Sequence, residues 1–314
     1  MKTAFVFPGQ GSQKQGMLSR AAQQYPQVKS TFDEAAAVLG YDLWDLCQNG
    51  PEESLNRTDI TQPALLTASI ALWRCWQAAG GATPEMLAGH SLGEYSALVV
   101  AGSLDFTDAV KLVHQRALAM QSAVPQGVGS MAAILGLEDR QVLDACEQSA
   151  GDQVVTAVNF NAPGQVVIAG HREAVERAIL ACKEAGAKRA MALSVSVPSH
   201  CALMQPAADT MAQALAGVTL RDAAIPVVQN VSAEATSDAS TLADNLVKQL
   251  YSPVRWTDSV RALAAADCQG LVECGPGRVL GGLVKRIEKG LPCLPLETPE
   301  QMEAALDQHR PQHS

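Results

Sequence analysis

Gly89-His90-Ser91-Leu92-Gly93 is a G-x-S-x-G pattern that lies between the apolar run Met86-Leu87-Ala88 and a helix-like run from Glu94 to Ala101. This context predicts a strand that turns sharply into a helix, the arrangement called a nucleophile elbow. Glycines suit such a turn because its backbone is crowded and can adopt positive φ. Residues without a Cβ tolerate both conditions. The turn would expose the Ser91 hydroxyl, and the helix N-terminus would offer free N–H groups to a developing oxyanion. The pattern therefore predicts acyl transfer through a serine ester, against the alternative of a glycine-serine turn without chemistry.

The overall composition is that of a folded, acidic protein. Of the 314 residues, 47% are hydrophobic and 18% are charged, and the formal net charge is −9. This hydrophobic content allows a substantial core, and the low share of charged residues argues against disorder. An acidic chain without a dense basic run is a poor general partner for nucleic acid, so we expect no nucleic-acid binding.

The cysteines and the apolar runs bear on metal binding and on location. The eight cysteines form no C-x-x-C pair, and none is spaced from a histidine as zinc ligands are. We therefore expect no metal site, and we expect reduced core thiols of the kind found in a cytoplasmic protein. The N-terminus lacks the apolar segment of a signal peptide, and no apolar stretch is long enough to span a membrane, so no membrane association is expected.

Strand-like and helix-like segments alternate over most of the chain, which predicts an α/β fold with a parallel sheet. We assign residues 1–123 and 198–314 to an α/β-hydrolase-like catalytic body. Its expected strands are Thr3–Phe7, Met86–Gly89, Ile225–Asn230 and Gly270–Glu273. Its expected helices span 19–39, 61–79, 93–101, 107–123, 199–215 and 242–250, and a further helix starts near 279.

The pattern changes near Val124, where a second unit interrupts the body. Its expected order is strand, helix, strand, strand, helix, strand, with the turn signal Asn161-Ala162-Pro163-Gly164 between the two central strands. Met191, Leu193, Val195 and Val197 alternate with smaller or polar residues, as in a half-buried final strand. This βαββαβ order predicts a ferredoxin-like subdomain inserted over residues 124–197.

A serine nucleophile needs a base, and His200 is the best candidate among the histidines. It follows the alternating strand through Pro198-Ser199 and precedes a helix, and loops at strand ends are where open α/β sheets place ligands. The alternative is a histidine that merely follows a Ser199 N-cap. Asp209 and Asp222 are possible third members, but nothing singles them out, and a backbone carbonyl could orient the imidazole instead.

Arg116 lies within the apolar stripe formed by residues 112, 113, 117 and 120 of an expected helix. A charge in that position is costly unless it is paired. Either the side chain reaches the surface along its aliphatic stem, or it faces a cavity and binds a carboxylate through two parallel N–H groups. The second alternative would mean that the substrate itself carries a free carboxylate.

Two glycine turns complete the candidate residues. Gln10 lies at the tip of the loop Gly9-Gln10-Gly11, where a backbone N–H could reach an oxyanion, although a simple strand-to-helix turn explains the loop equally well. Gly275-Pro276-Gly277 precedes a helix but lacks a complete phosphate-loop pattern, which favours a tight packing turn.

Together these residues resemble the malonyl-CoA:acyl carrier protein transacylases of bacterial fatty acid synthesis. The resemblance is carried, in order, by Phe7-Pro8-Gly9-Gln10-Gly11-Ser12-Gln13, Gly89-His90-Ser91-Leu92-Gly93-Glu94, Gln115-Arg116, Val197-Pro198-Ser199-His200 and Gly275-Pro276-Gly277. It extends from Phe5 to about Pro295, and the inserted subdomain also fits that family.

The resemblance implies a role for each matching residue. Ser91 would carry the malonyl ester, His200 would act as base and then as acid, and Arg116 would bind the free carboxylate of malonate. The amides of Gln10 and Leu92 would form the oxyanion hole. The family orients its catalytic histidine through a backbone carbonyl, and the matching position in this chain is Gln249. Asn159 and Asn161, which follow the second expected strand of the inserted unit, would lie near the family's substrate cleft.

The resemblance also implies a ping-pong transfer from malonyl-CoA to the phosphopantetheine thiol of acyl carrier protein, with coenzyme A thioester as a substrate and no cofactor. An acidic carrier would need a local basic patch, for which Lys285-Arg286, Lys183 and Lys188-Arg189 are candidates. Related acyltransferase domains of polyketide synthases and the transferase subunit of malonate decarboxylase share these motifs, but the chain shows no flanking synthase domains. A serine esterase and a non-catalytic binding module are the remaining alternatives. We expect a cytoplasmic monomer.

Overall fold

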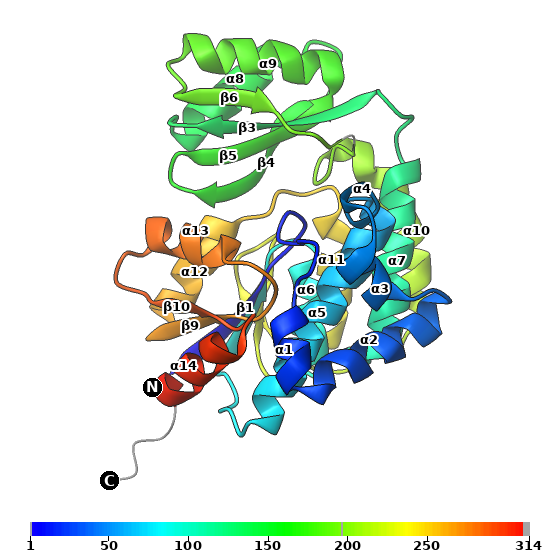
Figure 1. The fold of residues 1–314 in the computed structure, drawn as a ribbon. Helices are drawn as coiled ribbons and strands as arrows, with labels where there is room; N and C mark the ends of the chain where they lie inside the picture. Colours follow the sequence, from blue (N-terminus) through cyan, green and yellow to red (C-terminus); the bar gives the residue numbers. More distant parts are fainter. Residues whose placement is uncertain (1, 196, 310–314) are drawn as a thin grey trace.

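Two separate β-sheets organise the molecule, which is described here from a computed structural model covering residues 2–195 and 197–309. The larger sheet has the strand order β10-β9-β1-β2-β7-β8 (Figure 1). Neighbouring strands run parallel, except that β8 pairs antiparallel with β7. The strands are β1 (Thr3–Phe7), β2 (Met86–Gly89), β7 (Val227–Val228), β8 (Ala235–Thr236), β9 (Gly270–Glu273) and β10 (Cys293–Pro295).

Helices cover both faces of the larger sheet, as the hydrophobic pattern of β1 requires. Phe5 and Phe7 point into one core with helices on one side, whereas Ala4 and Val6 point into a second core on the other side. A parallel strand buried on both faces reads as a continuous apolar run, which explains Thr3–Phe7. The larger core includes α2 (Pro26–Leu39), α5 (Thr58–Ala78), α6 (Gly93–Val100), α7 (Phe106–Ser122) and α10 (Gln205–Ala216); the smaller includes α12 (Trp256–Ala265) and α13 (Val279–Ile287).

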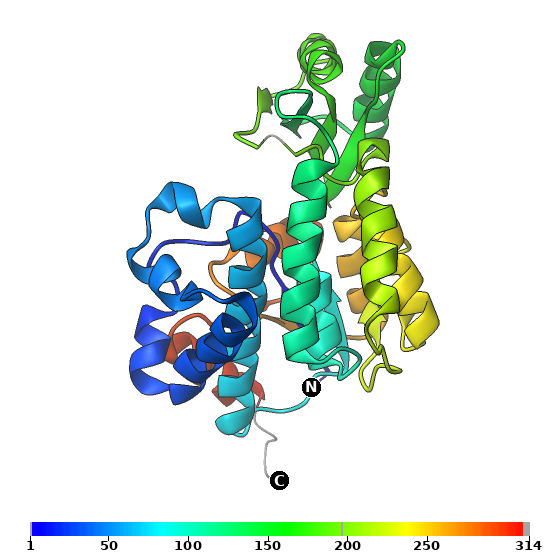
Figure 2. The ribbon, with the colours of Figure 1, turned by 90° about the vertical axis from the view of Figure 1, so that its right-hand side faces the viewer.

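The remaining elements of the body also add buried side chains to the larger core. α7 and α10 stand side by side beneath the second unit (Figure 2). Within the described residues, no helix combines the length and the apolar character needed to cross a membrane. These remaining elements are α1 (Ser19–Gln24), α3 (Leu43–Asn49), α4 (Glu52–Leu55), the 3-10 turn η1 (Ala202–Met204), α11 (Ala239–Gln249) and α14 (Pro299–His309).

The smaller sheet is a ferredoxin-like unit, as the sequence predicts. Its strand order is β4-β5-β3-β6, and every neighbouring pair is antiparallel. Its helices pack on the face that points away from the body (Figure 1). The elements are β3 (Gly129–Leu135), α8 (Asp139–Ala150), β4 (Val155–Ala162), β5 (Gln165–His171), α9 (Arg172–Glu184) and β6 (Arg189–Ala192).

The α/β class with an inserted subdomain is therefore confirmed, while its boundaries at 123/124 and 197/198 stay a proposal. Backbone hydrogen bonds tie β4 to the body: Phe160 N donates to Val254 O at 3.0 Å, and Val254 N donates to Val158 O at 2.8 Å. The open face of the small sheet is thereby held over the carboxyl ends of the parallel strands.

Several predicted elements are shorter than expected. The final strand of the small unit ends at Ala192, because Leu193 and Val195 line a cleft instead of a sheet face. The strand predicted over Ile225–Asn230 is reduced to Val227–Val228, and Pro226 before it has no N–H to donate.

Two predicted helices also differ from those in the structure. The helix expected over 19–39 is two helices, because Tyr25 is extended and Pro26 occupies the first turn of α2. The helix expected from Ser199 begins only at Gln205, since His200 has φ 64° and a 3-10 turn follows it.

Candidate active site

Ser91 lies at the tip of a sharp turn between β2 and α6, with φ 51°. The two flanking glycines permit this turn. A Cβ on Gly89 would lie 1.9 Å from the carbonyl carbon of Gly93, and a Cβ on Gly93 would lie 2.0 Å from the carbonyl oxygen of Phe7. The elbow predicted from the sequence is therefore enforced by close packing of β1, β2 and α6.

Asn230, just beyond β7, stabilises the strained turn. Its Oδ1 accepts a hydrogen bond from Ser91 N at 2.7 Å, and its Nδ2 donates to Gly89 O at 2.6 Å. One side chain from a neighbouring strand end thus satisfies backbone groups on both sides of His90, where the turn prevents them from pairing within a helix or strand.

The Ser91 hydroxyl and the His200 imidazole are in contact. Ser91 Oγ and His200 Nε2 are 2.8 Å apart, and His200 Nδ1 lies 2.7 Å from the backbone carbonyl oxygen of Gln249. Because a carbonyl can only accept, Nδ1 carries the proton and Nε2 is free to accept from the serine. The pair is therefore arranged for proton transfer from serine to histidine.

The surroundings of His200 keep its imidazole neutral. The side chain is 3% exposed. Burial lowers the pKa of His200 to about 3, with the Arg116 charge adding to this effect and the Gln249 carbonyl opposing it. At neutral pH the ring is thus an unprotonated acceptor rather than an imidazolium.

Arg116 is a buried cation beside the nucleophile. Its Nη1 donates to Gln62 Oε1 at 2.8 Å, and its Nη2 donates to Gln249 Oε1 at 2.9 Å and to Ser91 Oγ at 3.2 Å. The guanidinium carbon lies 5.6 Å from the centre of the Tyr95 ring. Among the described residues, Arg116 has only uncharged hydrogen-bond acceptors and makes no ion pair, although it is 1% exposed.

Gln10 and Leu92 lie beside the same space. The loop after β1 passes the elbow closely, since a Cβ on Gly9 would lie 2.5 Å from the carbonyl oxygen of His90. Gln10 and Leu92 line one cleft with Ser91 and His200. Neither amide has an acceptor among the described residues, as is needed of donors reserved for an oxyanion.

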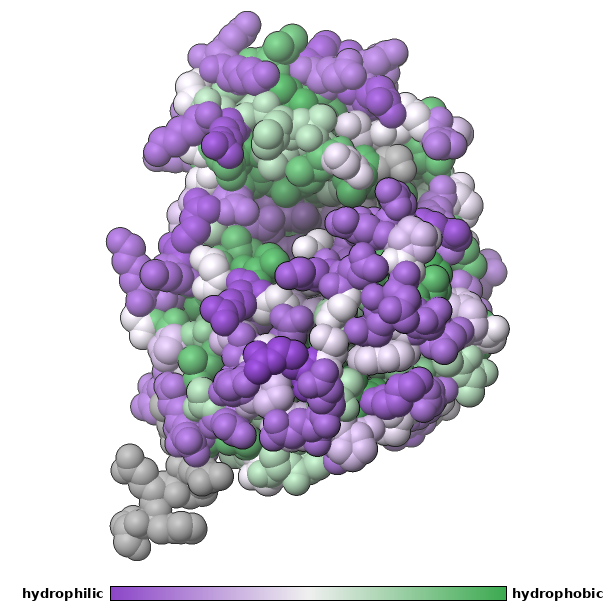
Figure 3. Space-filling view, in the orientation of Figure 1, coloured by the Kyte–Doolittle hydropathy of each residue, from purple (hydrophilic) through white to green (hydrophobic). Residues whose placement is uncertain are grey.

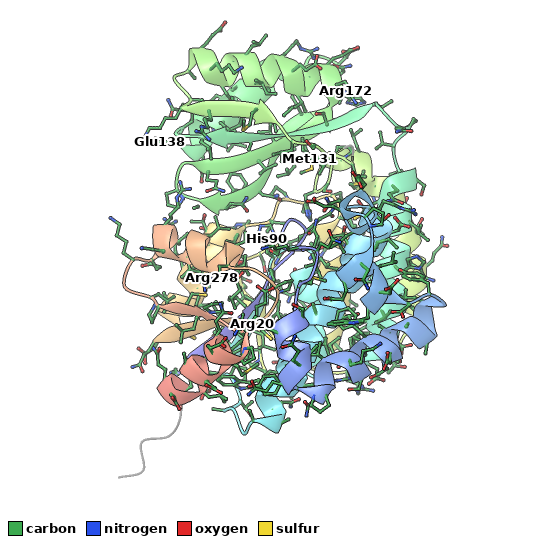
Figure 4. The ribbon with its side chains drawn as sticks, in the orientation of Figure 1. Arg20, His90, Met131, Glu138, Arg172 and Arg278 are labelled. Atoms are coloured by element: carbon green, nitrogen blue, oxygen red, sulfur yellow. The ribbon has the colours of Figure 1, made fainter. Side chains whose placement is uncertain are left out.

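This cleft, of about 370 Å³, lies between the body and the open face of the small sheet. Figure 3 shows the recess between the two units. His90 lies on its lower side and Met131 of β3 on its upper side (Figure 4). Met131, Val167, Leu193 and Val195 give the upper wall an apolar character, whereas the polar groups gather around Ser91.

A family model described as the acyl transferase domain matches residues 4–289. A malonyl CoA-acyl carrier protein transacylase from Salmonella typhimurium is 60% identical over 305 residues, which cover 97% of this chain and 99% of the relative. This chain belongs to the malonyl CoA-acyl carrier protein transacylase family.

Solved structures of similar transacylases have the same fold. An acyl carrier protein S-malonyltransferase from Vibrio cholerae is 56% identical with a TM-score of 0.95, and covers 97% of this chain and 99% of its own. A malonyl-transacylase solved in complex with its type II polyketide acyl-carrier protein is 54% identical with a TM-score of 0.97, and covers 98% of this chain and 100% of its own.

All six site residues predicted from the sequence of this transacylase lie at the cleft or in direct contact with residues that line it. Ser91, His200, Arg116 and Gln249 share hydrogen bonds, and Gln10 and Leu92 line the same space.

The other candidates lie elsewhere. Asp209 accepts from Gln205 Nε2 and Asp222 accepts from Ala239 N, so neither orients the histidine. Gly275 packs so tightly that a Cβ there would lie 2.3 Å from Pro8 Cγ, which supports the packing-turn interpretation. No cluster of three or more metal-ligating side chains occurs within residues 2–195 and 197–309.

Three polar residues of the transacylase site were not predicted as site residues from the sequence, although Glu94 is the last residue of the motif Gly89-His90-Ser91-Leu92-Gly93-Glu94. Gln62 lies in the mostly apolar helix α5, and it is fully buried. Glu94 lies in the first turn of α6 and is also fully buried. Asn230 follows a parallel strand, and its place at a strand end was the one available signal.

Proposed function

We propose that this transacylase moves the malonyl group of malonyl-CoA to the phosphopantetheine thiol of an acyl carrier protein, through a malonyl ester on Ser91, and so supplies fatty acid elongation. The observation that carries this proposal is Arg116, a buried guanidinium that makes no ion pair with any described residue and lies 3.2 Å from the Ser91 hydroxyl oxygen. A buried cation is costly unless an anion compensates it, and the free carboxylate of a malonyl ester would supply that anion.

In the first half-reaction, His200 Nε2 takes the proton of Ser91 Oγ as the oxygen attacks the thioester carbon. The carbonyl oxygen becomes an oxyanion that the amides of Gln10 and Leu92 stabilise. When the tetrahedral intermediate collapses, the carbon–sulfur bond breaks, and the proton on His200 goes to the leaving coenzyme A thiolate. The ester remains on Ser91.

The second half-reaction repeats these steps in the opposite direction. The phosphopantetheine thiol gives its proton to His200 and attacks the ester carbon, and the same two amides hold the oxyanion. The carbon–oxygen bond to Ser91 breaks, and the hydroxyl regains the proton from His200. Every proton in these steps passes between Ser91, His200 and the two thiols, so we propose that the reaction uses no cofactor.

The partner is proposed to be an acidic carrier protein that binds a basic groove between the small sheet and α13. Lys188, Arg189 and Arg286 border one groove beside the Pro163-Gly164 turn, whereas the chain as a whole carries a net charge of −9. A local positive patch on an acidic protein favours one docking site for an acidic partner. We further propose that the enzyme acts as a monomer in the cytoplasm.

Mass spectrometry of the intact protein after mixing with malonyl-CoA tests the function. The expected result is a malonyl adduct that peptide mapping places on Ser91 and that disappears when acyl carrier protein is added. Ser91→Ala is the control and should form no adduct. Free malonate released without a carrier would favour the esterase alternative, and the absence of any adduct would contradict the proposal.

The choice of carrier tests the pathway. Transfer to a fatty acid carrier protein in preference to a polyketide carrier supports a role in fatty acid elongation. The reverse preference would favour the polyketide-type alternative, for which the similar structure with a polyketide carrier is the relevant precedent.

A further inference from the structure

Glu94 is a buried carboxylate that none of the proposed chemical steps uses. It lies in the first turn of α6, three residues after the nucleophile, and is fully buried. Its Oε2 accepts from Gln249 Nε2 at 2.8 Å and from Asn230 N at 3.2 Å, whereas Oε1 has no partner among the described residues. Burying a carboxylate is expensive, so its contacts are a reason to look for a role.

The first contact determines how the Gln249 side chain is turned. Gln249 Nε2 donates to Glu94 Oε2 and to Ser91 O at 2.9 Å, which accounts for both of its hydrogens. The amide oxygen is then left facing Arg116 Nη2 at 2.9 Å. If the amide were flipped, its NH₂ group would face the guanidinium and its oxygen would face two acceptors.

The second contact reaches the elbow. Asn230 donates its backbone N–H to Glu94, while its side chain holds Ser91 N and Gly89 O. A single carboxylate oxygen, Glu94 Oε2, therefore contacts both the residue that holds the nucleophile turn and the amide that accepts from Arg116. Glu94 lies in α6, Asn230 follows β7 and Gln249 ends α11, so these hydrogen bonds join three separate segments.

The separation of Glu94 from Arg116 matters as well. Because the Gln249 amide stands between them, the carboxylate does not occupy the guanidinium N–H groups, which a direct ion pair would do. Burial raises the pKa of Glu94 to about 7, and the unpartnered Oε1 can take a proton while Oε2 keeps both of its hydrogen bonds.

We propose that Glu94 is a positioning residue that sets acyl selectivity: its carboxylate fixes the Gln249 amide with its oxygen toward Arg116, and so aims the guanidinium at the carboxylate of the Ser91-bound acyl group. This inference rests on the proposed malonyl transfer. It predicts that losing Glu94 reduces the preference for malonyl over acetyl, instead of lowering both rates alike.

The test compares kcat/KM for malonyl-CoA and acetyl-CoA in wild type, Glu94→Ala, Gln249→Leu and the double variant, each corrected for the folded fraction. In Glu94→Ala the malonyl-to-acetyl ratio should fall about tenfold, the scale of one misdirected buried hydrogen bond. In the Gln249→Leu background the same substitution should change the ratio by less than about twofold, because interacting residues are non-additive.

A ratio unchanged in Glu94→Ala, or an equal loss in both backgrounds, would overturn the inference. If Glu94→Ala does not fold, the isosteric Glu94→Gln replaces it, and the ratio should fall about threefold because a neutral amide can pair with either orientation of Gln249. An unchanged ratio in folded Glu94→Gln would likewise overturn it. Failure of the wild type to form a malonyl adduct would instead overturn the proposed function.

Discussion

The backbone carbonyl oxygen of Gln249 accepts a hydrogen bond from His200 Nδ1 at 2.7 Å, in the position where a serine protease has an aspartate. The carbonyl fixes the same tautomer as a carboxylate would, but it brings no full negative charge. An imidazolium formed here is therefore less stabilised, and the nearby Arg116 disfavours it further. Burial is the main reason that the pKa of His200 falls to about 3; the Arg116 charge adds to this effect, and the Gln249 carbonyl opposes it.

The pH dependence of acylation should show this low basicity. For the free enzyme, kcat/KM for malonyl-CoA should not decrease between pH 8 and about pH 5, because His200 stays unprotonated there. Stopped-flow measurement of coenzyme A release across that range checks the prediction. A decrease centred near pH 6.5 would contradict it, since that is the value of an unperturbed histidine.

The second half-reaction should respond to pH differently. The positive charge of Arg116 is one cause of the lowered pKa of His200. In the malonyl-enzyme, the substrate carboxylate would neutralise that charge. The acid limb for transfer to the carrier thiol should therefore lie at higher pH than the limb for acylation. An acetyl-enzyme is the matched control, because it brings no carboxylate; equal limbs for the two acyl-enzymes would contradict the explanation.

Folding stability should also depend on His200. Its folded pKa is lowered, so the unfolded chain binds the proton more readily, and stability is present above pH 6.5 and lost as pH falls toward 3. At pH 5 the loss attributable to this residue should be about 2 kcal/mol. Urea unfolding at pH 7 and pH 5 should show a smaller loss in His200→Gln than in wild type. The comparison with the variant is needed because Glu94 and Glu273, whose pKa values are raised, contribute with the opposite sign.

Arg116 should determine the preference for carboxylated acyl groups. Arg116→Ala should lower kcat/KM for malonyl-CoA about 10- to 100-fold more than for acetyl-CoA, as expected for a lost charge-assisted hydrogen bond. Arg116→Lys should recover part of this preference, because an ammonium keeps the charge but cannot contact Gln62, Gln249 and a carboxylate with one planar group. Retention of the full malonyl preference in Arg116→Ala would exclude the proposed role.

The elbow glycines should be intolerant of a methyl group. In Gly93→Ala the new Cβ would lie 2.0 Å from the Phe7 carbonyl oxygen, and rigid backbone cannot move aside without separating α6 from β1. The variant should lose activity and unfold at lower temperature. Gly282→Ala is the control: no heavy atom would lie within 4 Å of its Cβ on the exposed side of α13, so stability should rise by about 0.5–1 kcal/mol. Thermal unfolding of both variants, with activity at 25 °C, gives the comparison; an active, stable Gly93→Ala would refute the packing argument.

Local pattern was sufficient where the structure depends on neighbours in the chain. The G-x-S-x-G motif predicted the turn at Ser91 because the glycine requirement lies within the motif itself. The βαββαβ order predicted the inserted unit because each element carries its own periodicity. Arg116 stood out because a charge in the apolar stripe of a helix conflicts with its immediate surroundings.

Local pattern misled where apolar side chains have another destination. Leu193 and Val195 alternate as in a strand, yet they line the cleft beyond the end of β6. Periodicity records that a side chain avoids water, but it does not distinguish a sheet face from the wall of a cavity.

The sequence by itself determined the class of fold, the nucleophile turn and the candidate base. Only the tertiary structure decided that Gln62, Glu94 and Asn230 support the site, because each meets its partner across a long stretch of chain: 54 positions from Gln62 to Arg116, 155 from Glu94 to Gln249, and 139 from Asn230 to Ser91. Hydrogen bonds over such separations depend on how whole elements pack, and a single polar side chain in an apolar segment carries no record of the partner that packing will bring to it.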